Sequence, residues 1–496
     1  MKVAIYESST SQYVERPPYH PPQIYRELAK AAFRDIDAEN HAYDAVRRAL
    51  SLLSPAGDGE AGWNPLGAVI KPGDRIVLKP NLVSHEHGVQ LGQRCLTTHG
   101  SVIRATLDYA FIAGGRESKI VIADAPVQGA DFDKLLEQNG ISAIRDFYWR
   151  TFRYEIDVVD LRQVRAFLDE QSAYIRRVVQ LPGDPRGYSV IDLGPQSRLV
   201  PLDMVSARYA VGDYDEEATN TRHRLNHHEY VIANTILDAD AVLSIPKLKT
   251  HGKVGLTLAL KNIVGIVGSK DCLPHHRHGL AGAGGDEFPR NYPRRWLFAA
   301  RGNQLLQGHV PTRVWRALRS MAGAILGAGT PAAEKKTQPT KFFPSGSWYG
   351  NDTIWRTVDD LNLILYHWSR KTESFHPEPQ RRCLTLVDGI VSMEGNGPLK
   401  GSPRATGLIL ASRDPLALDV AAATLIGFDW RRLNILAGMA ATADERTYSR
   451  FHGDLDEIEI LSNEPSFSSV AALAGQRQHL PPSGWRNFVE ASQEEQ

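Results

Sequence analysis

Short apolar runs alternate with amphipathic stretches along most of this chain. Runs of strand length occur at residues 2–6, 75–78, 119–123, 155–159, 241–245, 384–387, 408–411 and 458–461. Apolar positions three and four apart, which are typical of helices, cover residues 25–53, 101–113, 132–138, 348–368 and 415–427. Because strands and helices alternate, the pattern predicts an α/β fold, with a mostly parallel or mixed sheet and helices on both faces.

The alternation weakens in two places. Residues 167–230 are less regular, with short strands predicted at 188–193 and 198–204, and they indicate a smaller lobe. Residues 271–345 are rich in Gly, Arg and Pro, and we interpret them as an inserted helical or irregular segment with a basic helix at 312–326. We therefore expect an α/β core in two parts, residues 1–270 and 346–470, followed by a polar tail at 471–496.

Charge and hydropathy exclude several classes of protein. Lys+Arg and Asp+Glu both number 57, so the formal net charge is zero and nucleic acid is not an expected partner. No apolar run approaches the roughly 18 residues that a membrane span needs. The first residues, MKVAIYESST, turn polar too early for a signal peptide. We expect a cytoplasmic protein.

Cysteine usage limits the cofactor. The chain has three cysteines, Cys95, Cys272 and Cys383, and they are far apart in the sequence. Cluster-binding cysteines come in closely spaced sets, so we expect no intrinsic iron–sulfur cluster. Low cysteine content also fits a reducing compartment. The cofactor is otherwise unknown, and a divalent metal ion is a candidate.

Several predicted strands end at residues that can carry chemistry. Lys79 and Asn81 follow one strand, Asp124 follows the next, and Asp388 follows a later one. In open α/β sheets the ligand crevice lies beyond the carboxyl ends of the strands. We therefore take Lys79 and Asn81 as substrate-binding candidates, and Asp124, Asp388 and Glu394 as metal-binding candidates. The alternative is that these residues are solvated strand ends and turn caps.

Residues 246–262 contain the densest set of candidates. Lys247, Lys249 and His251 follow an apolar run, and Lys261 and Asn262 interrupt a second one. A lysine inside an apolar run should be paired or functional. We assign catalytic roles to His251, Lys261 and Lys247, and substrate contacts to Lys249 and Asn262. The alternative is that they are exposed loop lysines and a histidine with an ordinary hydrogen-bond partner.

Three other segments supply candidate substrate contacts. A cluster of cationic and titratable side chains at residues 275–278 suggests anion binding or partial metal ligation, although an exposed basic loop explains it equally well. A capped helix start at 351–356 offers an anion site at its positive end. A glycine-rich loop at 395–397 exposes backbone N–H groups. The residues selected from these segments are His275, His276, Arg277, Asn351, Arg356 and Asn396.

Together, the segments Lys79-Pro80-Asn81, Thr98-His99, Asp124, 246–251 with 260–262, and 388–389 with 394–398 resemble the bacterial family called domain of unknown function 362. The resemblance spans about residues 75–430 and corresponds to a long form of the family. Many members of that family carry or adjoin a ferredoxin-like iron–sulfur module, whose cysteines this chain lacks. The resemblance supports the choice of residues more than it indicates a reaction.

We predict an enzyme that acts on an anionic small molecule, a carboxylate or phosphate, by proton transfer or metal-assisted group transfer. The reaction class is open among isomerase, transferase and oxidoreductase. Three alternatives remain: a non-catalytic protein that binds an anionic ligand or a partner, a redox protein that uses an external ferredoxin, and a membrane-surface protein acting through residues 312–326. The oligomeric state is not predicted.

Overall fold

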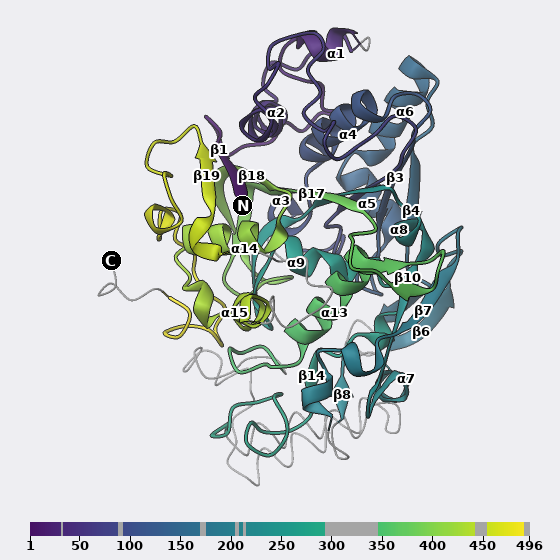
Figure 1. The fold of residues 1–496 in the computed structure, drawn as a ribbon, viewed down its shortest axis with the longest axis vertical. Coiled ribbons are helices and arrows are strands. Elements are labelled where there is room, and N and C mark those ends of the chain that lie inside the picture. The colour runs from purple at the N-terminus through teal and green to yellow at the C-terminus, as the bar shows by residue number, and fades with distance from the viewer. Residues whose placement is uncertain are drawn as a thin grey trace.

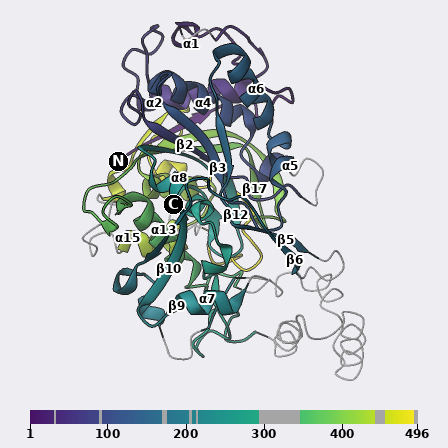
Figure 2. The same cartoon turned by 90° about the vertical axis from the view of Figure 1, so that its right-hand side faces the viewer.

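The structure is a computed structural model that describes residues 1–30, 33–87, 93–168, 175–203, 208–211, 215–292, 346–441 and 454–490. Its centre is a mixed sheet covered by helices on both faces (Figures 1 and 2). The predicted α/β fold is therefore confirmed. The predicted basic helix at 312–326 and most of the predicted insertion lie outside the described residues.

The central sheet joins strands from both ends of the chain. Within the described residues it has ten strands. Their order along the main path is β19 (Glu459–Ser462), β1 (Lys2–Glu7), β18 (Ser402–Ser412), β17 (Arg382–Glu394), β11 (Ala241–Ile245), β2 (Arg75–Pro80), β3 (Lys119–Asp124) and β4 (Asp157–Asp160). From β17 to β4 neighbouring strands are parallel, whereas β18 is antiparallel to both β17 and β1.

Two further strands extend the sheet at the carboxyl end of β11. β12 (Lys247–His251) pairs in parallel with the second half of β17, and β13 (Gly255–Thr257) pairs antiparallel with β12. The register between β12 and β17 shifts between Lys247 and Lys249, whose partners are Asp388 and Met393. This irregularity decides which way the two lysines point.

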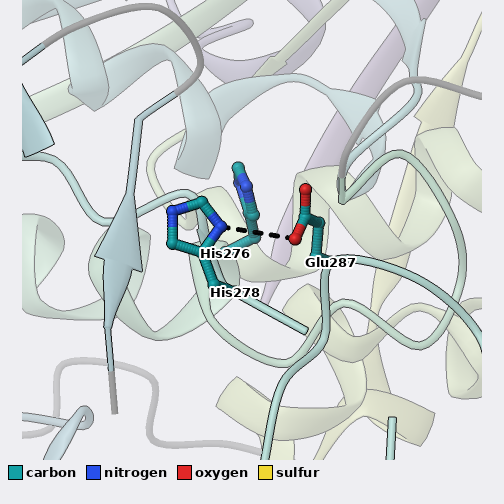
Figure 3. A group of neighbouring side chains, drawn as sticks. All are labelled: His276, His278 and Glu287. Atoms are coloured by element: carbon teal, nitrogen blue, oxygen red, sulfur yellow. Dashed lines mark hydrogen bonds and ion pairs between the residues drawn. The ribbon is translucent and has the colours of Figure 1, made fainter. Parts of the chain in front are cut away.

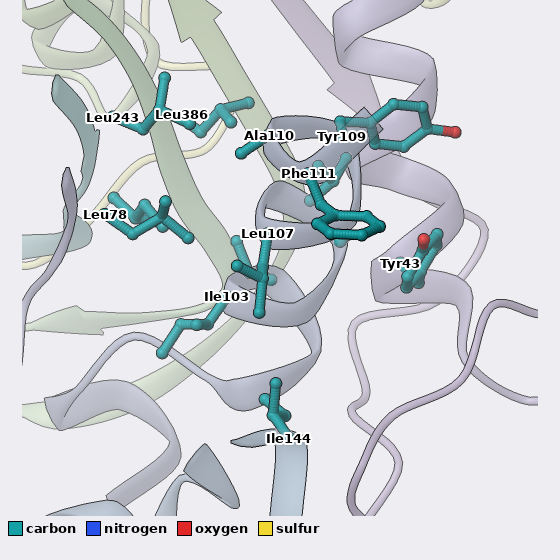
Figure 4. Close-up of a cluster of buried hydrophobic side chains, with 14 of the residues drawn as sticks. Tyr43, Leu78, Ile103, Leu107, Tyr109, Ala110, Phe111, Ile144, Leu243 and Leu386 are labelled. Carbon is teal, nitrogen blue, oxygen red and sulfur yellow. The ribbon is translucent and has the colours of Figure 1, made fainter. Parts of the chain in front are cut away.

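Side chains alternate between two cores, as expected for a sheet buried on both faces. In β2, Ile76 and Leu78 pack into one core and Val77 into the other. The first core holds residues of α1 (Arg26–Lys30), α2 (His41–Leu53), α4 (Gly100–Gly114), α5 (Phe132–Gln138) and α6 (Ile141–Phe152) (Figure 4). The opposite face is covered by α8 (Asn234–Leu237), α9 (Ala259–Asn262), α13 (Ile354–His367), α14 (Pro415–Leu425) and α15 (Asn434–Ala441).

The remaining elements are short. The region of the predicted lobe holds β5 (Val164–Leu168), β6 (Ile175–Gln180), β7 (Tyr188–Asp192), β8 (Tyr209–Ala210), α7 (Glu216–Arg222), β9 (His223–Arg224) and β10 (His227–Ala233). Elsewhere lie α3 (Gln93–Leu96), β14 (His276–Arg277), β15 (Trp368–Ser369) and β16 (Ser374–Phe375). Single 3₁₀ turns are η1 (Gly194–Gln196), η2 (Val200–Leu202), η3 (Ile263–Ile266), η4 (Lys270–Cys272), η5 (Trp430–Arg432), η6 (Leu455–Glu457) and η7 (Ala471–Leu473).

Several elements differ from the sequence-based expectation. The strand predicted at 198–204 is the 3₁₀ turn η2, because Pro201 lies at its start and supplies no backbone donor for a ladder. The helix predicted at 25–53 is two helices, α1 and α2. In the segment expected as a polar tail, Leu473, Trp485 and Val489 are buried in the core.

Candidate functional site

A cavity of about 150 Å³ opens at the carboxyl ends of β2 and β3, beside β12, β13 and α9. Its apolar lining includes Ala125, Val127, Val264 and Leu273. Its polar lining consists of Lys79, Asn81, Asp124, Lys249, His251, Thr257, Lys261, Asn262, Lys270 and His275. Eight of these ten residues are sequence-predicted site residues, so widely separated segments do meet in one cavity.

Lys79 and Asp124 form a buried ion pair in the cavity wall. The Nζ of Lys79 lies 2.7 Å from Oδ1 of Asp124, and both side chains are almost fully buried. The other carboxylate oxygen, Oδ2, accepts the backbone N–H of Leu82 at 2.7 Å. Burial lowers the pKa of Lys79 below its usual value, and the charge of Asp124 opposes that shift. The pair therefore links β2 to β3, and Lys79 balances the negative charge of Asp124.

A glycine lets the next segment close over this ion pair. The backbone N–H of Ala125 donates to the carbonyl of Gly265 at 2.9 Å. A Cβ at Gly265 would lie only 2.0 Å from Oδ1 of Asp124 and 2.4 Å from Nζ of Lys79. No side chain fits at position 265, so glycine is required there.

Two asparagines connect the strands across the cavity. Nδ2 of Asn262 donates to the carbonyl of Lys79 and to the hydroxyl of Ser244, and its Oδ1 accepts from Lys79 and from Asn81. Oδ1 of Asn81 in turn accepts from the Nζ of Lys249 at 2.6 Å. Burial, followed by the nearby Lys247 and Lys261, lowers the pKa of Lys249 to about 7. Cys95 opposes that shift.

Two more lysines, Lys261 and Lys270, add positive charge to the cavity. In the described part of the chain, neither forms an ion pair with a carboxylate. Lys261 is 9% exposed, and its ammonium has no hydrogen-bond partner among the described residues. Lys270 donates only to the carbonyl of Val264, at 3.2 Å, within the same residues. Burial and neighbouring lysines lower the pKa of Lys261 to about 8, and burial lowers the pKa of Lys270 to about 7.

Two cavity histidines are held in opposite tautomers. Nδ1 of His251 accepts the backbone N–H of Lys253 at 3.0 Å, so its proton resides on Nε2 when the ring is neutral. Nδ1 of His275 lies 2.6 Å from the carbonyl of Leu273, which can only accept, so His275 is protonated there and Nε2 is its free base. Burial and nearby lysines lower the pKa of both histidines well below the usual value.

Lys247 and Asp388 form a second polar cluster that does not line the cavity. Nζ of Lys247 lies 3.0 Å from Oδ2 of Asp388 and 2.6 Å from the hydroxyl of Tyr13. Asp388 also accepts from Tyr13 and from the backbone N–H of His99. Both charged side chains are fully buried. The catalytic role predicted for Lys247 has no support from this position.

The predicted metal-binding carboxylates do not meet. Asp124 pairs with Lys79, and Asp388 pairs with Lys247. Glu394 lies 3.3 Å from Arg404 and accepts the backbone N–H of Leu480. Each carboxylate neutralises a different cation, so the three do not form one ligand set.

The remaining predicted substrate contacts lie outside the cavity lining. Asn351 precedes the N-cap of α13, Thr353, and accepts the backbone N–H groups of Thr353 and Ile354. Arg356 forms an ion pair with Asp352, and Asn396 accepts from the backbone of Ser483. In contrast, His276 and Arg277 form β14 next to the cavity residue His275. Arg277 lies 3.6 Å from the carboxylate of Asp286, which balances its charge, so Arg277 does not offer an anion site.

The sequence analysis missed two residues that shape the site. Lys270 lines the cavity but follows no predicted strand. Asp419 on α14 accepts the backbone N–H groups of Ala259 and Leu260 at 2.9 and 3.0 Å, and thereby holds the start of α9, which carries Lys261 and Asn262. Burial raises the pKa of Asp419 to about 8. The sequence around Asp419 predicts only a helix with Asp414 as its N-cap, so it does not indicate this contact.

Comparison with known proteins identifies the part of the chain that builds most of this cavity. Residues 203–424 match the family model described as Domain of unknown function (DUF362). This part of the chain is similar to that family. The resemblance predicted from the motifs is confirmed, although the match is shorter than the 75–430 expected.

The cavity extends beyond the DUF362 match. Lys249, His251, Lys261, Lys270 and His275 lie inside the matched residues. The wall made by β2 and β3, which contains the Lys79–Asp124 pair, precedes the match. A complete site therefore needs the matched residues together with the preceding strands.

Two individual proteins extend the comparison. A thylakoid-associated protein of Synechocystis is 21% identical over 407 residues, which cover 81% of this chain and 78% of that protein. A crystal structure of a protein from Thermotoga maritima is 13% identical with a TM-score of 0.30. The latter match covers 73% of this chain and spans about half, 53%, of the Thermotoga chain. Among the helices of the described residues, none has the length and hydropathy needed to cross a membrane.

Proposed function

We propose that the cavity binds an anionic small molecule, a carboxylate or phosphate, and that His275 moves a proton on it while His251 donates a hydrogen bond. The observation that carries the proposal is the charge of the lining. Lys79, Lys249, Lys261 and Lys270 face a single lining carboxylate, Asp124, which is already paired with Lys79. Buried cations are costly unless an anion compensates them, so the surplus favours an anionic ligand.

The size of the cavity restricts the ligand. The cavity of this protein has a volume of about 150 Å³. A cavity of about that volume accommodates a molecule the size of benzene, which has about six non-hydrogen atoms. Inorganic phosphate and short hydroxy- or oxo-carboxylates fit this volume.

The histidine tautomers support proton transfer. His251 offers an N–H donor and His275 offers an unprotonated nitrogen, and both line the same cavity. A carbon next to a carboxylate loses a proton more easily when cations stabilise the developing negative charge. In this mechanism His275 accepts the proton and later returns it, while the Nε2–H of His251 donates a hydrogen bond to the developing negative charge. The lysines hold the carboxylate.

Substitution Lys261→Met tests the anion site. It removes a cation that has no hydrogen-bond partner among the described residues and keeps a side chain of similar length. We expect the affinity for inorganic phosphate or lactate, measured by titration calorimetry, to fall about 10- to 100-fold, the usual loss for a charge-assisted contact. The matched control is Lys400→Met at an exposed position, which should leave affinity unchanged. Equal affinity in both variants would refute an anion site at Lys261.

Anion affinity should also decrease with rising pH. Lys249 and Lys270 have pKa values of about 7, and Lys261 of about 8, so all three lose their protons as pH rises from 7 to 9. A bound anion raises these pKa values, so binding takes up protons. We expect lactate, whose carboxylate stays ionised, to bind at least about tenfold more weakly at pH 9 than at pH 7. Constant or tighter binding at pH 9 would contradict this prediction.

Variants of the two cavity histidines distinguish an enzyme from a protein that only binds the anion. In D₂O, a proton-transfer enzyme exchanges the hydrogen next to the carboxylate of its substrate, which NMR detects on a panel of small hydroxy-acids. His251→Asn and His275→Asn should slow this exchange by about 100-fold or more, with affinity nearly unchanged. If the wild-type protein binds an acid from the panel but exchanges none, the protein is a binder and not a catalyst.

We also propose that the protein acts in the cytoplasm. All three cysteines lie in the described residues, where they are buried and form no disulfide bond. Cysteines without disulfide bonds suit a reducing compartment. Fractionation of cells with an antibody against the chain tests this location, and recovery with membranes would refute it.

A further inference from the structure

A second cluster lies directly behind the wall of the cavity. It consists of His276 and His278, two residues apart at β14, and Glu287 from the following loop (Figure 3). One ligand atom from each of these residues lies within 4.8 Å of the other two. The cavity residue His275 immediately precedes the cluster, so the two sites share one segment of backbone.

The separations within the cluster suit a small metal ion. Nδ1 of His278 lies 3.3 Å from Oε2 of Glu287, the contact marked by the dashed line in Figure 3. Two ligands bound to tetrahedral zinc at its usual bond lengths are about 3.4 Å apart. One ligand atom of His276 lies within 4.8 Å of the other two, so a shift of the His276 ring toward them would complete a three-ligand set.

A buried nitrogen is the independent sign that a ligand is missing. His276 is 1% exposed, and its Nε2 has no hydrogen-bond partner among the described residues. An unsatisfied polar atom at such a depth costs about 1–3 kcal/mol. A metal ion at Nε2 would satisfy it.

The surroundings already orient the other two ligands. Nε2 of His278 lies 3.0 Å from Oε1 of Glu216, a carboxylate that fixes the ring with Nδ1 toward Glu287. Oε2 of Glu287 also accepts the backbone N–H of Gly279 at 3.1 Å. A histidine held by a carboxylate on its far nitrogen is the common arrangement around protein-bound zinc.

We propose that His276, His278 and Glu287 bind a divalent transition metal, with zinc as the ion that best fits two imidazoles and one carboxylate. The fourth position would be taken by water. The metal would fix the loop between residues 279 and 286 against β14 and so brace the segment that carries His275. This site is independent of the anion-binding proposal.

Lys253 gives the proposal a distinctive prediction. Its Nζ lies 3.4 Å from Nδ1 of His276, so its charge opposes a dication there. Replacing it with methionine should therefore tighten metal binding, whereas loss of a ligand should weaken it. The substitution leaves the backbone N–H of Lys253, which His251 uses, in place.

The experiment measures zinc on the full-length chain after treatment with a chelator. Stoichiometry is read by elemental analysis, and affinity by competition with a chromophoric chelator. We expect one zinc per chain, at least about 100-fold weaker binding in His276→Ala and Glu287→Gln, and tighter binding in Lys253→Met. The control His376→Ala, on a hairpin away from the cluster, should bind like the wild type.

Circular dichroism shows which variants are folded. If both ligand variants fail to fold, Lys253→Met decides the matter, since tighter zinc binding supports the site and unchanged or weaker binding overturns it. The proposal is also overturned if the wild-type chain retains no zinc at micromolar free metal, or if folded His276→Ala and Glu287→Gln bind zinc like the wild type.

Discussion

Replacing Asp124 with alanine is expected to lower the free energy of unfolding by about 3–5 kcal/mol, the usual cost of breaking a buried ion pair from one side. The substitution leaves Lys79 buried without its counter-ion and removes the acceptor of the Leu82 backbone N–H. Urea unfolding followed by circular dichroism measures the change. The control Asp146→Ala breaks an exposed pair with Arg150 and should change stability by less than about 1 kcal/mol.

The loss should depend on pH in a defined direction. Burial lowers the pKa of Lys79 and the charge of Asp124 opposes that shift, so removing Asp124 should lower the pKa of the folded-state lysine further below its unfolded value. Folding then releases a proton, so the penalty grows as pH falls below the unfolded pKa of the lysine. The deficit at pH 6 should exceed that at pH 9, by up to about 1.4 kcal/mol per pH unit. An equal deficit at both values would show that only hydrogen bonds were lost.

Asp388→Ala is expected to destabilise the protein by a similar amount, about 3–5 kcal/mol. Asp388 is the carboxylate partner of Lys247, and it also accepts from Tyr13 and from the backbone of His99. All of these groups lie between β17, β12 and the N-terminal segment. The same urea titration measures the loss.

A double variant separates charge from packing at this position. Adding Lys247→Met to Asp388→Ala removes the uncompensated cation and should recover part of the stability. If the double variant is less stable than Asp388→Ala, the lost contacts, and not the buried charge, account for the destabilisation.

The part of the site that was predictable lies at strand ends. Lys79 and Asp124 lie at the carboxyl ends of the parallel neighbours β2 and β3, and the carboxyl ends of parallel strands meet at one edge of a sheet. Lys261 could be predicted as a site residue because a charged side chain inside an apolar run is rarely buried unless it is paired or functional. These arguments use only local sequence and the general geometry of the fold.

Asp388 shows where that reasoning stops. The Asp-Gly pair suggests a strand end, yet β17 continues to Glu394 and pairs with both β12 and β18. The register shift between Lys247 and Lys249 then gives these two lysines different partners, although strict alternation would put them on the same side of β12. A local irregularity of this kind depends on three strands at once and has no signature in any one of them.

A second group of residues could not be predicted from the sequence: Lys270, Asp419 and Glu287. Each acts on a segment far away in the sequence or comes from a loop without a periodic pattern. Asp419 contacts residues 160 positions earlier in the chain, at the start of α9. Only tertiary packing brings such residues to the site, so neither spacing nor periodicity indicates them.

The position of β1 in the sheet has a consequence for biosynthesis. The strand at residues 2–7 is hydrogen-bonded to β18 and β19, which are made only after residue 400. A ribosome releases the first strand long before its neighbours exist, so Val3 and Ile5 must stay without their native partners during almost the whole of translation. The protein should therefore complete its sheet only after β18 and β19 have been made, and a stalled chain that ends before β18 should be a target for chaperones that bind apolar segments.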